Sequence, residues 1–447
     1  MKNTVQEAAR SLPVYDRADV LVVGGGSAGT AAALAAARQG ARTILLERYG
    51  YLGGLASGGQ VAFLPKMGDG NSTPVGGIME EWLECLARQD GLLAPPPEDI
   101  GREDPQALAK WSLCVGMVRG GKVCHSAAFD PELLKVVLAE LLAKAGVITY
   151  HHCLVCDAVM EDEVPQGVIM ETKEGRCAIL ADRIIDATGD GDLLPYTKTA
   201  YEEEDDPAYR NSMVSEIFRV KDCDNMRYGR WRQANPGEFG ARMKELQELV
   251  GYQAMVINSY RNDVGWINNF IAGKESYSIR DVSETEFMVK RSIPVAIDFL
   301  RQNIPGYENC RLLDIATFGV RHSRRVKGVH RITHKELMAG TVFSDTIYAT
   351  SCFSNGDCLS ESLEYCVPYG SLIPEATDNL LVAGRCFSSD LVAHSCLNLI
   401  PYCVMTGQAA GLAAAMSLQQ KVQPRHLPVE QLQAALKAQG VVLPKGL

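Results

Sequence analysis

The stretch that most constrains the fold runs from Val20 to Arg48 and reads VLVVGGGSAGTAAALAAARQGARTILLER. A short apolar run comes first, glycines follow it, and a run of small residues then ends at Gly40. A second apolar run, TILLE, begins at Thr43. This order predicts a strand, a tight turn, a helix and a second strand, which is the opening unit of an α/β fold.

The glycines of this stretch predict a binding site. Gly24, Gly26 and Gly29 fit the pattern G-x-G-x-x-G directly after the first expected strand. The first glycine permits the turn, the second lets a pyrophosphate approach the backbone, and the third lets helix and strand pack closely. Glu47 ends the second expected strand, 18 residues after Gly29, where a carboxylate can accept hydrogen bonds from ribose hydroxyls. We expect a dinucleotide-binding unit; the alternative is a glycine turn made only for packing.

Three further segments indicate which dinucleotide is bound. YGYLGGLASGG follows Glu47 almost at once, and its glycines allow a second backbone segment to lie on a cofactor. IIDATGDGD and NLLVAGRCFSSD each carry an apolar run into a turn, at Thr188 and Gly189 and at Gly384 and Arg385. An NAD-only domain has no need of the second segment, and the order of the four pieces is typical of FAD-binding flavoproteins. We therefore predict FAD.

Composition limits the class of protein. The 447 residues carry a formal net charge of -10, which argues against a general role in binding polyanions. The first residues lack the apolar core of a secretory signal, and no uncharged apolar run reaches the roughly 18 residues of a membrane span. The 14 cysteines are then expected to be reduced thiols rather than a disulfide framework. We expect a cytoplasmic protein without nucleic-acid or membrane partners.

The chain divides into three segments by pattern. Residues 1–200 are expected to form the first part of an FAD-binding domain, which includes a helix capped by Asp130 and stopped by Gly146. Residues 201–320 become mixed and polar-aromatic, and we expect a substrate domain there. Residues 321–447 return to buried-strand and small-residue helix patterns and complete the FAD-binding domain.

The sequence resembles a known family over residues 19–418, in the pieces GGGSAG, GGLAS, FDPELLKVVLAELLAKAGV, IIDATGDGDL, GVRHSRRVKG, VPYGSLIP, NLLVAGRCFS and MTGQAAGLAAA. It is similar to FAD-dependent oxidoreductases related to fumarate-reductase flavoproteins and to proteins of the glucose-inhibited-division type. The resemblance implies an α/β fold, with a Rossmann-like FAD-binding domain of the glutathione-reductase type and an inserted α+β substrate domain. It also implies redox chemistry on a small organic substrate, with FAD bound covalently or noncovalently.

Two positions depart from the family pattern. Asn398 stands in SCLNLIP where relatives commonly carry arginine, and His322 stands in GVRHSRR where they often carry glutamate. Both positions are expected where flavin and substrate meet, so both indicate a proton-transfer scheme or a substrate unlike those of better-known relatives.

Arg321, His322 and His394 are the catalytic candidates. The basic stretch GVRHSRRVKGVHRITHKE begins after an apolar run, so we place its start on a strand, with Arg321 near flavin or substrate. His394 precedes an Ala-rich helix whose positive end is expected to face the flavin, and a histidine there can exchange a proton during hydride transfer. The alternatives are arginines paired with acidic neighbours and a structural histidine bonded to a loop carbonyl.

Function follows from these residues together. We expect oxidation of a small substrate by hydride transfer to flavin N5, with reduction of an activated alkene or a flavin-binding tRNA-modifying partner as alternatives. The sequence shows no second G-x-G-x-x-G unit that would indicate an NAD(P)H domain. The electron acceptor is therefore expected to be oxygen, a quinone or a carrier protein. A homo-oligomer is also possible. No metal site is expected, and Cys153 and Cys156, on a strand, are not expected to form a redox pair. The candidate cofactor-binding residues are Gly24, Gly26, Ser27, Ala28, Gly29, Glu47, Arg48, Gly53, Gly54, Leu55, Val155, Thr188, Gly189, Gly384, Arg385, Asn398 and Leu399.

Overall fold

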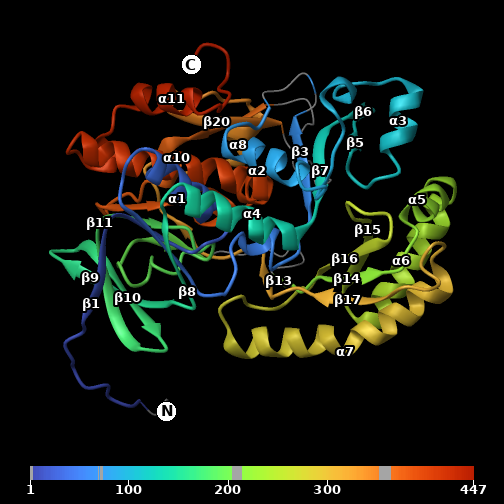
Figure 1. Cartoon of the computed structure of the whole chain (residues 1–447), viewed down its shortest axis with the longest axis horizontal. Coiled ribbons are helices and arrows are strands. Elements are labelled where there is room, and N and C mark those ends of the chain that lie inside the picture. Colours follow the sequence, from blue (N-terminus) through green and yellow to red (C-terminus); the bar gives the residue numbers. More distant parts are fainter. Residues whose placement is uncertain (1–3, 69, 71–73, 204–213, 352–363) are drawn as a thin grey trace.

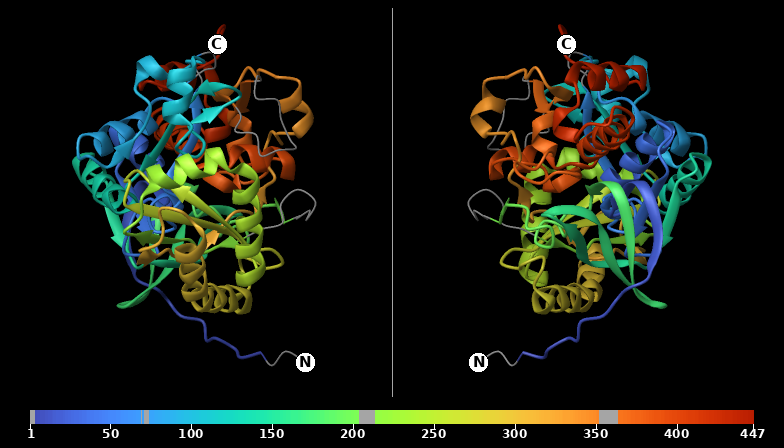
Figure 2. Two further views of the ribbon diagram at one scale, coloured as in Figure 1. Left: turned by 90° about the vertical axis from the view of Figure 1, so that its right-hand side faces the viewer. Right: turned by 90° about the vertical axis from the view of Figure 1, so that its left-hand side faces the viewer.

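The computed structural model of the chain describes residues 4–68, 70, 74–203, 214–351 and 364–447 (Figure 1). The predicted opening unit is confirmed: strand β1 (Val14–Val23), helix α1 (Ser27–Arg38) and strand β2 (Thr43–Glu47) follow in order. The first described residues precede β1 as an extended segment that leads away from the body of the molecule (Figure 2).

A seven-stranded sheet forms the centre of the larger unit. Its main path is β8-β2-β1-β11-β10-β9, and β22 pairs with the end of β11. The pairs among β8, β2, β1, β11 and β22 are parallel, whereas β9, β10 and β11 form an antiparallel meander. The further bounds are β8 (Ile148–His151), β9 (Leu154–Glu161), β10 (Val164–Thr172), β11 (Gly175–Asp186) and β22 (Leu380–Val382). The fold is therefore mixed α/β with a parallel-strand sheet.

The central strands are buried on both faces. In β1, Val20 and Val22 pack into the core on the helix side, whereas Leu21 and Val23 pack into a second core on the opposite side. Burial of both faces is the usual state of parallel strands, and it accounts for the continuous apolar run LVV rather than an alternating pattern.

Helix α10 (Ile400–Gln419) packs against α1 over the sheet (Figure 1). The contact uses glycine: a Cβ on Gly407 would lie 2.1 Å from the carbonyl oxygen of Ala28, and one on Gly411 would lie 2.0 Å from that of Ala32. The helix is longer than the Ala-rich segment from which it was predicted, because it begins before that segment at Ile400. The two helices therefore touch backbone to backbone, and both begin at the same edge of the sheet.

Further helices surround this core. Helix α4 (Pro131–Lys144) is capped as predicted, since the Asp130 carboxylate accepts hydrogen bonds from the backbone N–H groups of Glu132 and Leu133. The other elements of this unit are β3 (Phe63–Gly68), α2 (Ile78–Ala87), β4 (Leu92–Leu93), α3 (Pro105–Trp111), β5 (Val118–Arg119), β6 (Lys122–Val123), β7 (His125–Phe129), α8 (His334–Met338), β20 (Thr346–Ser351), β21 (Glu364–Pro368), α9 (Leu391–Leu397) and α11 (Val429–Ala438).

A second unit lies at the lower right of Figure 1 and has a hydrophobic core of its own. Its antiparallel sheet has the order β15-β16-β14-β17 and is accompanied by helices α5, α6 and α7. The bounds are β14 (Phe218–Lys221), α5 (Asn225–Ala234), α6 (Pro236–Val250), β15 (Gln253–Asn258), β16 (Val264–Phe270), α7 (Ile279–Asn303) and β17 (Arg311–Ile315). The predicted domain limits at residues 200 and 320 stay predictions.

Two short strand pairs join this unit to the larger one. Strand β13 (Val214–Ser215) pairs with β18 (Gly319–Val320), and β12 (Tyr201–Glu202) pairs with β19 (Arg325–Val326). The segment that enters the second unit and the segment that leaves it therefore run side by side. The sequence YEEEDDPAY, residues 201–209, predicts an acidic turn or linker, and its residues 204–209 lie outside the described residues.

The basic stretch begins on a strand, as predicted, but this strand does not extend to Arg321. Strand β18 ends at Val320, and the chain is irregular until β19 begins at Arg325. His322 and Ser323, within this irregular segment, are both buried. The short paired segments take their hydrogen bonds from β13 and β12 rather than from a long ladder, and this breaks the period of two.

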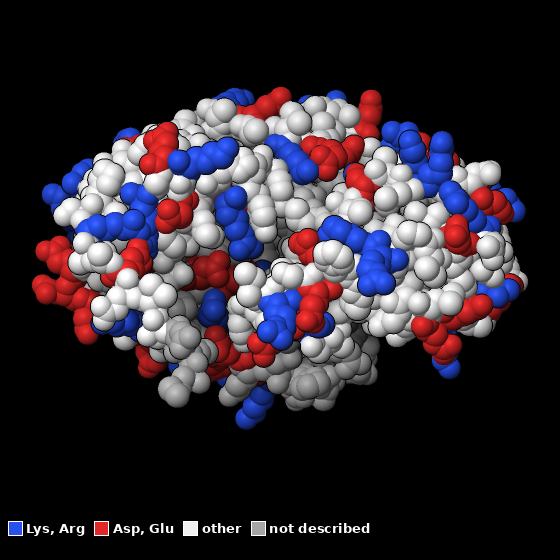
Figure 3. Space-filling model, turned by 90° about the horizontal axis from the view of Figure 1, so that it is seen from below, with Lys and Arg blue, Asp and Glu red and all other residues white. Residues whose placement is uncertain are grey.

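Three arginines of the stretch are paired with carboxylates. Arg324 contacts Glu203 and Asp192, and Arg325 and Arg331 both contact Glu202. On the face shown in Figure 3, lysine and arginine side chains are interspersed with aspartate and glutamate. Among the described residues, no single helix is long and apolar enough to cross a membrane; α9 and α10 pass that test only as a pair bent by 95°.

Candidate functional site

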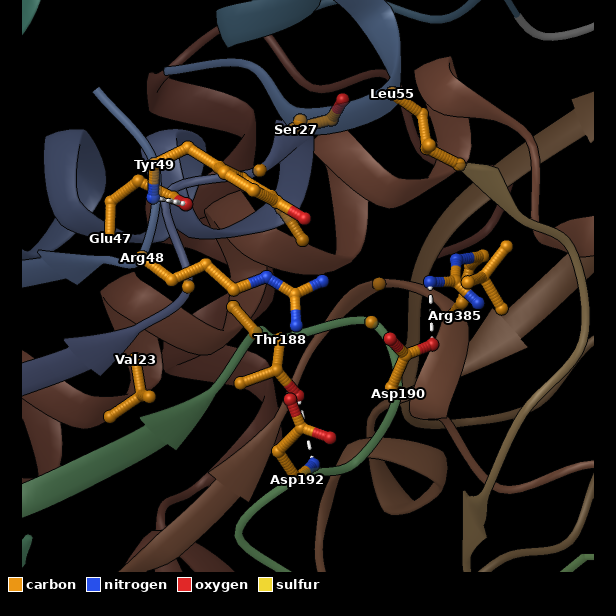
Figure 4. A pocket seen from close by; sticks show the side chains of 18 of the residues that line it. Val23, Ser27, Glu47, Arg48, Tyr49, Leu55, Thr188, Asp190, Asp192 and Arg385 are labelled. Atoms are coloured by element: carbon orange, nitrogen blue, oxygen red, sulfur yellow. Dashed lines mark hydrogen bonds and ion pairs between the residues drawn. The ribbon is translucent and has the colours of Figure 1, made fainter. Parts of the chain in front are cut away.

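A pocket opens where the carboxyl ends of β1, β2 and β11 meet the first turns of α1 and α10. Its empty volume is about 1090 Å³, including the part open to solvent. Figure 4 shows the side chains that converge on it from turns far apart in the sequence. Clefts at the carboxyl ends of parallel strands are the usual ligand sites of α/β sheets.

The first glycine turn forms the floor of the pocket. Gly24 has a φ of +96°, and a Cβ there would lie 2.7 Å from the carbonyl oxygen of Ala187, the residue that follows the neighbouring strand β11. A Cβ on Gly29 would lie 1.7 Å from the carbonyl oxygen of Gly24, so α1 can begin this close to the turn only with glycine. The N-terminal backbone of α1 therefore faces the pocket, as an anionic phosphate requires.

Glu47 holds this turn in place. Its carboxylate accepts hydrogen bonds from the backbone N–H groups of Gly25 at 2.7 Å and Tyr49 at 2.8 Å. Burial raises the pKa of Glu47 above its ordinary value, although the two hydrogen bonds act in the opposite direction. Each carboxylate oxygen keeps a second lone pair, so the residue can still accept bonds from a ribose.

The second glycine segment lies directly on the first. Gly53 donates its N–H to the carbonyl oxygen of Gly25 at 2.8 Å, and the hydroxyl of Ser27 donates to the carbonyl oxygen of Gly53 at 3.2 Å. A Cβ on Gly54 would lie 2.9 Å from the Cα of Gly26. Two backbone segments therefore line one wall of the pocket at a separation that side chains would prevent.

Arg48 extends into the pocket from the end of β2, and its guanidinium lies above Thr188 in Figure 4. The guanidinium carbon is 5.0 Å from the ring centre of Tyr49, which stacks on Tyr51 with 5.3 Å between ring centres. The Tyr51 hydroxyl is 2.8 Å from the hydroxyl of Thr317, and burial raises the pKa of Tyr51 to about 12. This aromatic pair therefore closes one side of the pocket next to the positive charge of Arg48.

An acidic turn after β11 forms the opposite side. Asp190 makes an ion pair with Arg385 at 2.9 Å, and Asp192 donates its backbone N–H to the Thr188 hydroxyl. The side chain of Asp192 is 36% exposed, and it lines the pocket. Burial and the charge of Asp190 raise the pKa of Asp192 to about 7. The residue is therefore divided between its charged and neutral forms near neutral pH.

The three catalytic candidates lie together, at the end of the pocket where Asn398 stands. Among the residues that the structure describes, Arg321, His322 and His394 do not line the pocket itself. The rings of His322 and His394 are 5.1 Å apart, and both histidines are buried. The guanidinium carbon of Arg321 is 4.1 Å from the ring centre of Phe270, on β16 of the second unit.

Comparison with known families decides what the pocket holds. The family described as FAD-dependent oxidoreductase matches residues 19–436, which is nearly the whole chain. The chain belongs to this family. It is an FAD-dependent oxidoreductase, and its cofactor is FAD.

Solved structures similar to the oxidoreductase share little sequence with it. A geranylgeranyl bacteriochlorophyll reductase-like protein from Thermoplasma acidophilum is 13% identical, with a TM-score of 0.47 over 95% of this chain and 84% of that one. A p-nitrophenol 4-monooxygenase from Pseudomonas putida is 14% identical, with a TM-score of 0.44 over 95% and 81%. A myxobacterial chondrochloren halogenase is 13% identical, with a TM-score of 0.46 over 94% and 78%. Likeness at this level carries no argument about substrate or reaction.

The pocket residues fit FAD. The glycine turns leave backbone open where a pyrophosphate must approach, Glu47 keeps acceptors, and Arg48 brings a cation. Of the cofactor residues expected from the sequence, those that line the pocket are Gly24, Gly26, Ser27, Ala28, Glu47, Arg48, Gly54, Leu55, Val155, Thr188, Gly189, Gly384, Arg385 and Asn398.

The remaining three expected residues support the wall from behind. Gly29 packs on Gly24, Gly53 bonds to Gly25, and Leu399 is the N-cap of α10.

Sequence reasoning missed several residues that line the pocket of the oxidoreductase. Tyr49 and Tyr51 belong to the motif YGYLGG, of which only the glycines indicate a cofactor site. Asp190 and Asp192 belong to GDGD, whose glycines likewise indicate only a turn. Thr317, Phe318 and Val320 carry no motif. The pairing of β13 with β18, and the hydrogen bonds of Thr317 with Gly58 and Tyr51, hold this segment at the pocket. The missed lining residues are Val23, Leu46, Tyr49, Tyr51, Cys153, Leu154, Ala187, Asp190, Asp192, Thr317, Phe318, Val320, Ile400 and Cys403.

Proposed function

We propose that the protein oxidises a small organic substrate by hydride transfer to flavin N5, and that it belongs to the branch of flavoproteins related to fumarate reductases. The observation that carries this proposal is the end of the pocket at which the two units meet. There Leu55 and Asn398 of the larger unit stand beside Thr317, Phe318 and Val320, which leave the second unit. A substrate held between the two units reaches this end of the pocket first.

FAD, when bound, supplies a ring that accepts a hydride. The residues of the chain bind and orient it. The turn at Gly24 and Gly26 and the first turn of α1 would hold its pyrophosphate, and Glu47 would accept hydrogen bonds from its ribose. The positive end of α10, whose first residue lines the pocket, would stabilise negative charge on the ring.

We assign the proton transfer to His322 rather than to His394. His394 donates its Nε2–H to the carbonyl oxygen of Arg385 at 2.7 Å, and its Nδ1 lies 3.4 Å from the side-chain nitrogen of Asn398. Both ring nitrogens of His394 thus contact protein atoms. His322 lies beside it, 5.1 Å away between ring centres, and stands where the chain returns from the second unit. Arg321, the residue before His322, is then placed to bind a polar or anionic substrate group.

The test is flavin reduction without oxygen. The holoenzyme is mixed rapidly with alcohols, amines and other small oxidisable compounds, and bleaching of the flavin is followed. For a compound that bleaches the wild type, His322→Gln is expected to slow bleaching by about 10²–10⁴-fold, because a positioned base contributes that much. His330→Gln is the matched control, since His330 contacts Glu336 and Phe343 and is outside the pocket lining.

Two results would contradict the proposal. An unchanged rate in His322→Gln removes the histidine from proton transfer. Reoxidation of the dye-reduced flavin by activated alkenes, with no bleaching by any reductant in the panel, reverses the direction of the reaction. The acceptor is identified by the same instrument, by following reoxidation with oxygen, with a quinone and with a carrier-protein fraction.

A further inference from the structure

Asn398 stands at the point where the pocket, α9 and α10 meet. It is the C-cap of α9, it precedes the N-cap of α10, and its side chain lines the pocket although the residue is only 9% exposed. Its Nδ2 group lies 3.2 Å from the carbonyl oxygen of Arg321 and 3.4 Å from Nδ1 of His394. The carbonyl oxygen of Arg321 and Nδ1 of His394 therefore both contact the nitrogen of the side-chain amide.

The carbonyl oxygen of Arg321 fixes the orientation of that amide. A carbonyl can only accept a hydrogen bond, so the atom of Asn398 that faces it must be the nitrogen. The opposite orientation would bring two oxygens together and lose the bond. Rotating the amide by 180° would lose this hydrogen bond, whichever ring nitrogen of His394 carries the proton.

A second carbonyl fixes the histidine in the same way. Nε2 of His394 lies 2.7 Å from the carbonyl oxygen of Arg385, so Nε2 carries the proton and donates. In the neutral ring Nδ1 then holds a lone pair, and it accepts from the second N–H of Asn398. The two carbonyls, the imidazole and the amide thus form one consistent set of donors and acceptors.

The oxygen of the amide is what this arrangement leaves for a ligand. Within the described part of the chain, no hydrogen bond reaches Oδ1 of Asn398, and the side chain to which it belongs lines the pocket. Nearby, the Thr317 hydroxyl is occupied by the hydroxyl of Tyr51. A fixed, nearly buried and unbonded acceptor selects a ligand group that donates.

We propose that Asn398 Oδ1 accepts the hydrogen bond of the flavin imide N3–H, and that His394 is a positioning residue that keeps the amide in this orientation. The proposal rests on FAD occupying this pocket with its ring at the α10 end. In the oxidised isoalloxazine ring, N3–H is the N–H donor, so it is the group that an acceptor at this end can recognise. An arginine at this position could only donate, which makes the asparagine of this chain a specificity-determining residue.

The first test uses the unaltered protein. The full chain is freed of flavin and titrated with FAD and with FAD methylated at N3, and affinity is followed by flavin fluorescence. The expected result is a dissociation constant about tenfold or more higher for the methylated flavin, since the methyl group removes the donor and leaves the acceptor unpaired. Equal affinity for the two flavins overturns the proposal.

The second test locates the effect at Asn398. Asn398→Leu removes the acceptor at similar volume, so FAD is expected to bind about tenfold more weakly and the methylated flavin within twofold of its wild-type affinity. Equal weakening for both flavins indicates a structural role and overturns the proposal. Asn303→Leu is the control, because the Asn303 amide contacts Phe299 within α7 of the second unit.

A spectroscopic readout covers the case in which the leucine variant does not fold. In the wild-type holoprotein with FAD labelled by ¹⁵N at N3, the imide proton is expected to exchange slowly with water and to give a distinct resonance. Rapid exchange overturns the proposal. None of these measurements uses a substrate, so their failure is separate from failure of the proposed oxidation.

Discussion

Replacement of Gly407 by alanine tests how the pocket is held open. Gly407 lies on α10 one helical turn before Gly411, and both face the backbone of α1. The added methyl group would lie 2.1 Å from the carbonyl oxygen of Ala28, whereas real Cβ atoms do not come within 3.0 Å of such an atom. The helices must therefore separate locally by roughly 0.9 Å, and neither partner is a flexible side chain that can turn away.

The energetic result has two parts. Forcing a methyl group between two buried backbones costs about 3 kcal/mol, at the upper end for overpacking. Alanine in a helix gains about 1 kcal/mol over glycine. Stability is then expected to fall by about 2 kcal/mol. Because Ala28 and Cys403, next to the contact, both line the pocket, the same displacement is expected to weaken FAD binding by about tenfold, or about 1.4 kcal/mol.

The assay combines denaturant unfolding of the flavin-free protein with titration by FAD. Gly411→Ala has a similar clash, 2.0 Å from the carbonyl oxygen of Ala32, but lies a turn farther from the pocket; it should lose similar stability and less FAD affinity. Gly240→Ala, in exposed helix α6 with no atom within 4 Å of its new Cβ, should gain about 1 kcal/mol. If Gly407→Ala is as stable as Gly240→Ala, the close packing of α1 and α10 is refuted.

Three further substitutions test side chains that line the pocket. The raised pKa of Asp192, about 7, makes the folded state bind a proton that the unfolded chain has already released, so folding stability falls as pH rises from about 4 to 7. The stability of Asp192→Asn relative to the wild type, from thermal melts of the flavin-free protein, should therefore grow through that window and level off above it; a constant difference contradicts the assignment. Tyr51→Phe removes the hydroxyl contact with Thr317 and should cost about 1 kcal/mol. Thr317→Val should cost about the same, and the double variant little more than either, whereas additive losses would show that the hydroxyls do not interact.

The sequence predicted the parts of the fold that depend on local geometry. The turn at Gly24 needs a positive φ and a small residue at Gly29, and only a strand, a turn and a helix in that order use glycine in this way. The helix after Asp130 was predicted equally well, because its N-cap, its first-turn proline and its terminating glycine all indicate the same bounds. The local sequence was enough to predict these elements, because each is specified by residues within its own length.

The sequence could not predict contacts that other elements create. Nothing in TFGV, residues 317–320, indicates a pocket wall; β13 places it there by pairing with β18. The strand expected at the start of the basic stretch ends already at Val320 for the same reason, since a run of residues does not show where its pairing partner ends. His394 was singled out for its chemistry, yet the bond to the carbonyl of Arg385 is visible only in three dimensions.

Motifs that lie far apart in the sequence meet at one pocket for a structural reason, and Asn398 reaches the pocket by a different route. Parallel strands deliver their following turns to one edge of the sheet, so motifs after β1, β2, β11 and β22 converge although they span much of the chain. Asn398 comes from none of these turns. It is placed by the break between α9 and α10 and is bonded to the carbonyl of Arg321, which lies on the return from the second unit. The amide thus contacts the segment that returns from the second unit and also lines the pocket, which no glycine motif of the sequence indicates.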